Sequence, residues 1–203
     1  MLKEIFDLVK GTASETVLNE TPLPDDQSQA VVTEATNTVA SGLRNMVAGG
    51  GVQNILDLFG SKGGDKKSLL SNPLVLMMIG HFAGKLISKY RMNSNQANNI
   101  AGDLIPGVLG NLINKTNDPN ASQFSIDEIL ASITGGQSKQ IVQEKAGQGG
   151  GLMDILGNLT GGGNQGNGGG LMDIIGQLAS GAQQQQERNG GGGLLDLIKG
   201  FTR

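Results

Sequence analysis

Three short segments near the C-terminus share one apolar pattern, and glycine-rich spacers separate them. The segments are 152–159, 171–178 and 194–201, and a glycine precedes each of them. When each is numbered 1 to 8, apolar residues stand at positions 1, 2, 4, 5 and 8, and an aspartate stands at position 3. We call this pattern the repeat frame. On a helix these positions form one wide apolar face, and the acid falls in the first turn, where the helix dipole favours it.

Two segments nearer the N-terminus fit the same frame. They are 52–59, which is a looser copy, and 2–9, which lacks the leading glycine. The three C-terminal copies begin 19 and 23 residues apart. A solenoid keeps a fixed period, because its repeats stack on one another. The uneven spacing therefore predicts short helices on a flexible tether.

A single repeat is expected to be unstable by itself. Burying five large apolar side chains contributes roughly 8–15 kcal/mol, at about 1.5–3 kcal/mol each. Ordering nine residues costs about 13 kcal/mol, so the two contributions nearly cancel. Each repeat should thus become helical only when it docks on another apolar surface. The expected partner-docking residues are Leu152, Ile155, Leu156, Leu171, Ile174, Ile175, Leu194, Leu197 and Ile198.

Composition argues against an enzyme and against a disulfide-stabilised or membrane-spanning protein. Glycine supplies 34 of 203 residues and the chain has no cysteine, which excludes disulfides and thiolate metal sites. No nucleophile–base–acid set can be assembled, and no cofactor or metal site is expected. Acids lie among the apolar residues of the N-terminus, and no apolar run reaches the ~20 residues of a membrane span. We expect a cytoplasmic protein.

The charge of the chain is unevenly distributed. The whole chain has a net charge of −3, but the segment 62–115 has seven bases and two acids. Within it, His81, Lys85 and Lys89 lie four residues apart and form a stripe on one helix face, which we interpret as a possible face for an acidic partner. A nucleic-acid surface over 62–91 is an alternative, although an acidic protein with few aromatic residues disfavours it, and a solvated face is the simpler interpretation.

The rest of the chain is predicted to be a bundle of helices without strands. Pro106 is expected to break or kink the helix in which it lies. Helix-capping signals mark the ends of four segments. These run from a cap at Asp25, Asp26 or Ser28 to about Ala48, from Asn72–Pro73 to about Tyr90, from a cap at Ser94 onward, and from the capping box Ser125–Glu128 to Gly135–Gly136.

Three short stretches in the middle of the chain carry a resemblance to a known family. They are GKLISKY at 84–90, NSNQA at 93–97 and LIPGVL at 104–109, and a polar loop and the helix that begins at Ser125 follow them. This stretch, about 69–136, resembles the YidB-like family of bacterial domains of unknown function. The amphipathic N-terminus and the C-terminal LLDLIKGFTR also look like that family. The resemblance implies a small all-α, homeodomain-like fold and no particular activity.

These observations predict an all-α chain in three parts. Residues 1–24 form an N-terminal amphipathic helix and linker, 25–136 a small helical bundle domain of YidB-like type, and 137–203 a Gly/Gln-rich tail with the three short repeats. We expect a non-enzymatic interaction or scaffold protein whose repeats dock on a protein partner or on another copy of the chain. Peripheral attachment to a membrane through the same helices is the alternative.

Overall fold

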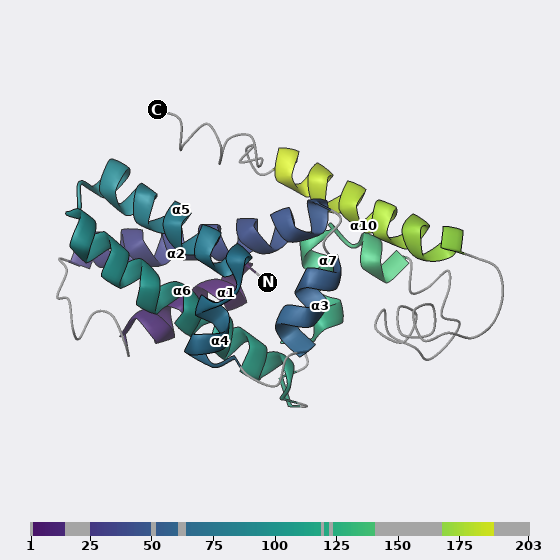
Figure 1. The fold of residues 1–203 in the computed structure, drawn as a ribbon, viewed down its shortest axis with the longest axis horizontal. Coiled ribbons are helices and arrows are strands. Elements are labelled where there is room, and N and C mark those ends of the chain that lie inside the picture. Colours follow the sequence, from purple (N-terminus) through teal and green to yellow (C-terminus); the bar gives the residue numbers. More distant parts are fainter. Residues whose placement is uncertain are drawn as a thin grey trace. The chain divides into compact units, whose positions relative to one another are not determined.

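A computed structural model of the chain describes residues 2–14, 25–49, 52–60, 64–118, 120–121, 124–140 and 168–188. The helices are α1 (Leu2–Thr12), α2 (Asp25–Ala48), α3 (Val52–Gly60), α4 (Lys66–Leu70), α5 (Pro73–Tyr90), α6 (Ser94–Thr116), α7 (Ile126–Ile133) and α10 (Gly168–Arg188). None of these residues lies in a strand (Figure 1). The prediction of an all-α fold is therefore confirmed.

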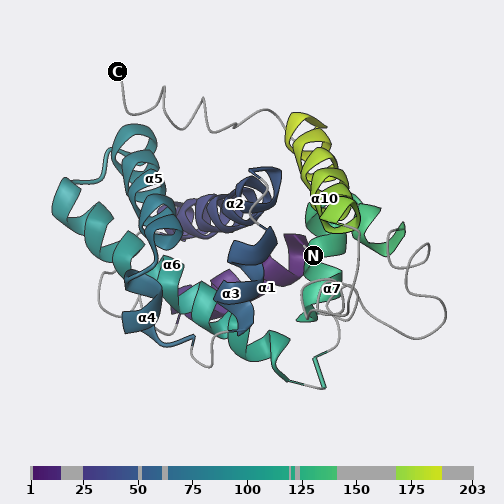
Figure 2. The same ribbon diagram turned by 45° about the vertical axis from the view of Figure 1, so that its right-hand side comes forward.

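The chain divides into two compact units. Unit 1 comprises Met1–Gly42 and Leu58–Ser122, and unit 2 comprises Leu43–Asp57 and Gln123–Arg203. Helices α2 and α3 each pass from one unit into the other. In unit 1, α6 packs against α5, α1 and α4, and α5 and α6 lie side by side in both views (Figures 1 and 2). In unit 2, α10 packs on α7.

Helix α5 begins and ends where its capping residues predict. The Asn72 side chain accepts a hydrogen bond from the backbone N–H of Leu74 at 2.9 Å, and Pro73 occupies the first helical position, where its missing N–H costs nothing. At the other end Arg91 adopts a left-handed conformation with φ of 54°. The N–H of Met92 then bonds to the carbonyl of Leu86 at 3.2 Å, which closes the last turn.

Helix α6 continues through Pro106, so of the expected break or kink the break is wrong. Its N-cap is Asn93, one residue before the predicted Ser94, and its side chain accepts from the N–H of Gln96 at 2.8 Å. A proline inside a helix costs about 3 kcal/mol. Burying one large apolar side chain contributes about 1.5–3 kcal/mol, and α6 buries several, including Ile100, Leu104 and Leu109. Packing on three neighbouring helices thus outweighs the cost of the proline.

Local capping also sets the ends of α7 and α4. The Ser125 side chain accepts from the N–H of Glu128 at 3.3 Å, so Ser125 caps α7 as predicted, while the Glu128 carboxylate pairs with the ammonium of Lys139 at 2.7 Å. Beyond α7, Gly135 and Gly136 have φ of 67° and 90°, which residues with a side chain rarely adopt. Helix α4, capped by Asp65, was not expected from the sequence, because five residues are too few for a periodic pattern.

Candidate docking interfaces

The repeat frame recurs in three of the described helices, and each buries the same two positions. Position 4 is Ile5 in α1, Ile55 in α3 and Ile174 in α10, and these side chains are at most 1% exposed. Position 8, which is Val9, Phe59 and Leu178 in the same order, is also at most 1% exposed. Position 6, which is Asp7, Asp57 and Gly176, is exposed in all three helices. The frame therefore defines one orientation of the helix against an apolar surface.

In α10 the repeat frame docks inside unit 2, where the helix approaches the turn that follows α7. A Cβ placed on Gly181 would lie 2.6 Å from the carbonyl oxygen of Thr134, so glycine permits this close approach. A Cβ on Gly135 would collide with the side chain of Gln185. The amide of Gln183 donates to the carbonyl of Ala48 at 3.2 Å, which adds a polar contact at the end of α2.

Helix α10 is longer than the predicted repeat 171–178. It begins at Gly168 and continues to Arg188, through residues that the sequence assigns to spacers, and Gly176 does not end it. A docked helix is stabilised by tertiary packing more than by the intrinsic propensities of its residues. Burial of Ala182 one turn beyond Leu178 extends the docked face past the frame itself.

The structure places the expected docking residues as follows. Ile174 is buried within its own chain and Ile175 is half-buried, so Ile174 is not presented to an outside partner. Docking on its own chain explains this, because a tethered surface has a high effective concentration. Leu171 lies in α10, but its side chain is outside the described residues. The remaining residues, Leu152, Ile155, Leu156, Leu194, Leu197 and Ile198, also lie outside them.

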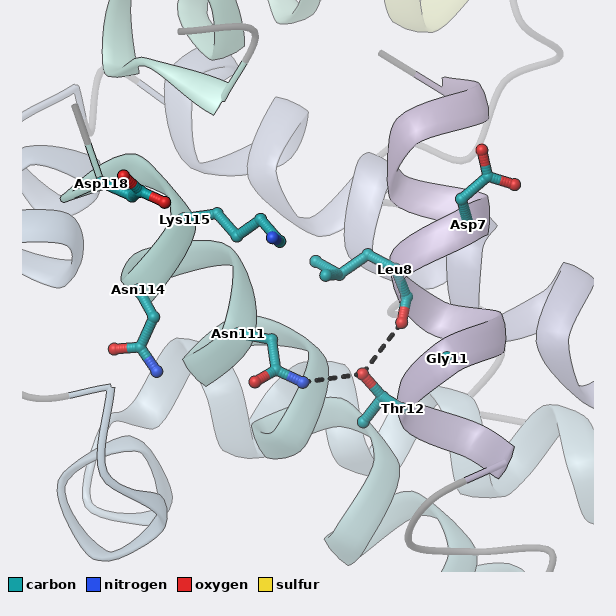
Figure 3. Close-up of a pocket in the computed structure, with 8 residues that line it drawn as sticks. All are labelled: Asp7, Leu8, Gly11, Thr12, Asn111, Asn114, Lys115 and Asp118. Atoms are coloured by element: carbon teal, nitrogen blue, oxygen red, sulfur yellow. Dashed lines mark hydrogen bonds between the residues drawn. The ribbon is translucent and has the colours of Figure 1, made fainter. Parts of the chain in front are cut away.

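In unit 1 the frame of α1 packs on α6, and a polar pocket opens beside the contact (Figure 3). The Thr12 hydroxyl donates to the carbonyl of Leu8 at 2.9 Å, and the Asn111 amide donates to that hydroxyl at 2.9 Å. The pocket has a volume of about 410 Å³. Its lining is Asp7, Leu8, Gly11, Thr12, Asn111, Asn114, Lys115 and Asp118.

The two sides of this pocket could not be paired from the sequence. Thr12 and Asn111 lie 99 residues apart, and neither stands in a recognisable motif. Lys115 extends from α6 toward Leu8 of α1 (Figure 3). Asp7, Asp118 and Lys115 are the charged residues of the lining, and the Asp7 carboxylate points away from Lys115 (Figure 3).

The basic stripe on α5 meets a buried acid that sequence spacing does not show. Glu34 of α2 has a side chain only 4% exposed. It accepts from the ammonium of Lys85 at 2.5 Å and from that of Lys89 at 3.1 Å. Burial alone would raise the pKa of Glu34, but the two lysines outweigh burial and hold this pKa below its ordinary value. Two of the three stripe residues thus neutralise a carboxylate of their own unit.

The other groups of the stripe respond to the same cluster. The hydrogen bond to Glu34 raises the pKa of Lys89. His81 is half-buried, and its pKa is lowered, chiefly by burial and then by the charge of Lys85, while Glu34 opposes this. A lowered pKa keeps the His81 imidazole mainly neutral at pH 7, so it adds little positive charge for an acidic partner.

Neither a metal cluster nor a membrane span is found in the part of the chain that the structure describes. Within 2–14, 25–49, 52–60, 64–118, 120–121, 124–140 and 168–188, no three His, Asp or Glu side chains come together as metal ligands. No helix in those ranges is long and apolar enough to cross a bilayer. Comparison with known proteins finds no matching family model and no significantly similar curated protein or solved structure. The YidB-like resemblance stays a prediction.

Proposed function

We propose that this chain is a non-enzymatic interaction or scaffold protein that associates through its repeat-frame helices. One observation carries the proposal: in α1, α3 and α10 the residues at positions 4 and 8 are at most 1% exposed. Three segments far apart in sequence thus bury the same two positions of the frame. A pattern used in this way three times is a docking element.

The chain holds two more copies of this element. In 152–159 the residues at positions 4 and 8 are Ile155 and Leu159, and in 194–201 they are Leu197 and Phe201. All four are large and apolar, as docking at these positions requires. Several weak sites on one chain raise the apparent affinity through effective concentration, without any new contact. The proposed role of the two copies is to bind a protein surface, either on a partner or on a second copy of the chain.

Two alternatives are weaker. A nucleic-acid role for 62–91 is disfavoured because Lys85 and Lys89 both pair with Glu34, which leaves less positive charge for phosphates. Membrane attachment through the repeats is disfavoured by their composition, since surface-binding helices carry a Lys/Arg-rich polar face, whereas 152–159 contains one acid and no base.

The proposal is tested with point variants that leave α10 intact. In the full chain, Ile155→Asn and Leu197→Asn are combined, and both alter position 4. The control combines Gly157→Asn and Lys199→Asn, which alter position 6 of the same two copies. Assembly size is measured by light scattering, and co-purifying proteins are identified from the native source. The position-4 variant should lose assembly size or partners that the control retains. Equal profiles for both variants and the unmodified chain would contradict the proposal.

A further inference from the structure

In two of the docked helices the buried face continues beyond the repeat frame. When the numbering of the frame is carried on along the helix, position 12 is Ala13 directly after α1 and Ala182 in α10, and both are 0% exposed. Positions 4, 8 and 12 are four residues apart and lie on one helix face, and position 11 borders that face. In both helices the residue at position 11 contacts the surface on which the helix packs.

The two surfaces that receive these helices differ in what they admit at position 11. In α1 this residue is Thr12. A Cβ on Gly107 of α6 would lie 3.0 Å from its methyl carbon, and the Asn111 amide donates to its hydroxyl (Figure 3), so α6 receives a side chain there. In α10 the residue is Gly181, where a Cβ would lie 2.6 Å from the backbone carbonyl oxygen of Thr134. A backbone atom cannot move aside as a side chain can, so the turn after α7 excludes a side chain at position 11.

One other copy of the frame meets the demand of this turn, Thr134–Gln137, which we call the α7 acceptor. The copies in α1 and α3 have a threonine and a lysine at position 11, so the α7 acceptor excludes both of them. The repeat 152–159 has Gly162 at this position, and large apolar residues stand at its positions 4 and 8. It therefore matches α10 at each position that the α7 acceptor constrains.

We infer that the α7 acceptor selects repeat-frame helices by glycine at position 11, and that the repeat 152–159 of the same chain is its alternative occupant. The eleven residues 141–151 connect Gln140 to this repeat, and an extended chain of that length spans about 36 Å, so the repeat can reach the turn. Helix α10 has Ala182 at position 12 where the repeat has Gly163. It therefore buries one more methyl group than the repeat would, which makes α10 the preferred occupant.

Only one of these two copies can occupy the α7 acceptor at a time. The inference rests on the proposed function, because the copy that is left undocked is the one that presents its positions 4 and 8 to a partner. When a partner binds α10, the repeat 152–159 replaces α10 on the acceptor and recovers part of the free energy that undocking costs. Exchange of the two copies thus makes α10 available to a partner that could not otherwise displace it.

The test places threonine, the residue that α1 has at position 11, into α10 and measures amide hydrogen exchange of the full chain by mass spectrometry. In Gly181→Thr the exchange of 171–182 should become at least tenfold faster, and that of 152–159 should become at least tenfold slower. The control is Gly176→Thr, at a position where a Cβ would meet no atom within 4 Å. It should neither speed the exchange of α10 nor slow that of 152–159. Threonine has a higher helix propensity than glycine, so a loss of docking arises at the acceptor.

Two double variants test the glycine of the repeat itself. Gly181→Thr combined with Gly162→Thr closes the acceptor to both copies, so 152–159 should exchange as fast as in the unmodified chain. Gly181→Thr combined with Gly157→Thr alters position 6, which is exposed in every described copy of the frame, and 152–159 should stay protected. The exchange of α6 should be equal in all variants, which checks that the rest of the fold is intact.

Several results would overturn the inference. Unchanged exchange of α10 in Gly181→Thr would show that the turn admits a side chain at position 11. Unchanged exchange of 152–159 in that variant, or exchange as slow as that of α10 in the unmodified chain, would show that the two copies do not share one acceptor. Protection of 152–159 in both double variants would show that Gly162 does not decide the fit. None of these measurements involves a partner, so the proposed function, tested by co-purification, fails or stands separately.

Discussion

Replacing Gly181 by alanine tests whether α10 is docked on the turn that follows α7. In an exposed helix, Gly→Ala stabilises by about 1 kcal/mol. At Gly181, however, the new Cβ would lie 2.6 Å from the backbone carbonyl oxygen of Thr134, and a backbone atom cannot move aside as a side chain can. Relieving such overpacking costs about 1–3 kcal/mol. The change should therefore bring no net gain and a loss of up to about 2 kcal/mol.

Gly176→Ala in the same helix is the matched control. A Cβ on Gly176 would meet no atom within 4 Å, so only the gain of about 1 kcal/mol in helix propensity applies. The two variants should thus differ by about 1–3 kcal/mol in the free energy of opening α10, which is roughly a 5- to 150-fold difference in exchange rate. Hydrogen exchange of the α10 amides measures this opening. If Gly181→Ala slows exchange as much as Gly176→Ala does, α10 is not docked there and the reasoning is wrong.

Two further predictions concern unit 1. Because the pKa of Glu34 is held below its ordinary value, its ion pairs stabilise the fold fully above the ordinary pKa and are lost as the pH falls through the lowered pKa. Glu34→Gln should lower the free energy of unfolding by about 1–3 kcal/mol at pH 7 and reduce the loss of stability as the pH falls. Urea unfolding across pH 3–7 measures both effects. If the loss of stability at low pH is unchanged in the variant, other carboxylates cause it. Asn72→Ala removes the cap of α5 and should cost about 1 kcal/mol in urea unfolding, while Asn72→Ser should retain most of the stability; equal losses would show that the cap contributes nothing.

The ends of most helices could be predicted because they depend on local chemistry. The Asn72–Pro73 start of α5 and the Ser125 cap of α7 each involve a side chain and a backbone N–H two or three residues apart. The extent of α6 and of α10 depends on packing partners distant in sequence. Pro106 and Gly176 both argue against a continuous helix locally, and burial of the surrounding face outweighs them.

The candidate interfaces were only partly predictable. The apolar positions of the repeat frame were readable from the sequence, because one helix face needs no distant partner to define it. The surface on which α10 packs could not be predicted, because α7 lies about 40 residues away in the sequence. The pairing of Lys85 with Glu34, 51 residues apart, could not be predicted from the sequence either. The basic stripe was therefore interpreted as a charged face without a partner in its own chain.

The central claim is that position 4 of the repeat frame carries the docking contact and position 6 does not. It is tested most directly by denaturant unfolding of four variants of the full chain: Ile5→Ala and Ile55→Ala at position 4, and Asp7→Ala and Asp57→Ala at position 6. The isoleucines are at most 1% exposed, so each truncation should cost about 2–5 kcal/mol. The aspartates are exposed, and each change should cost less than about 1 kcal/mol. Similar losses at both positions would contradict a docking face defined by the frame.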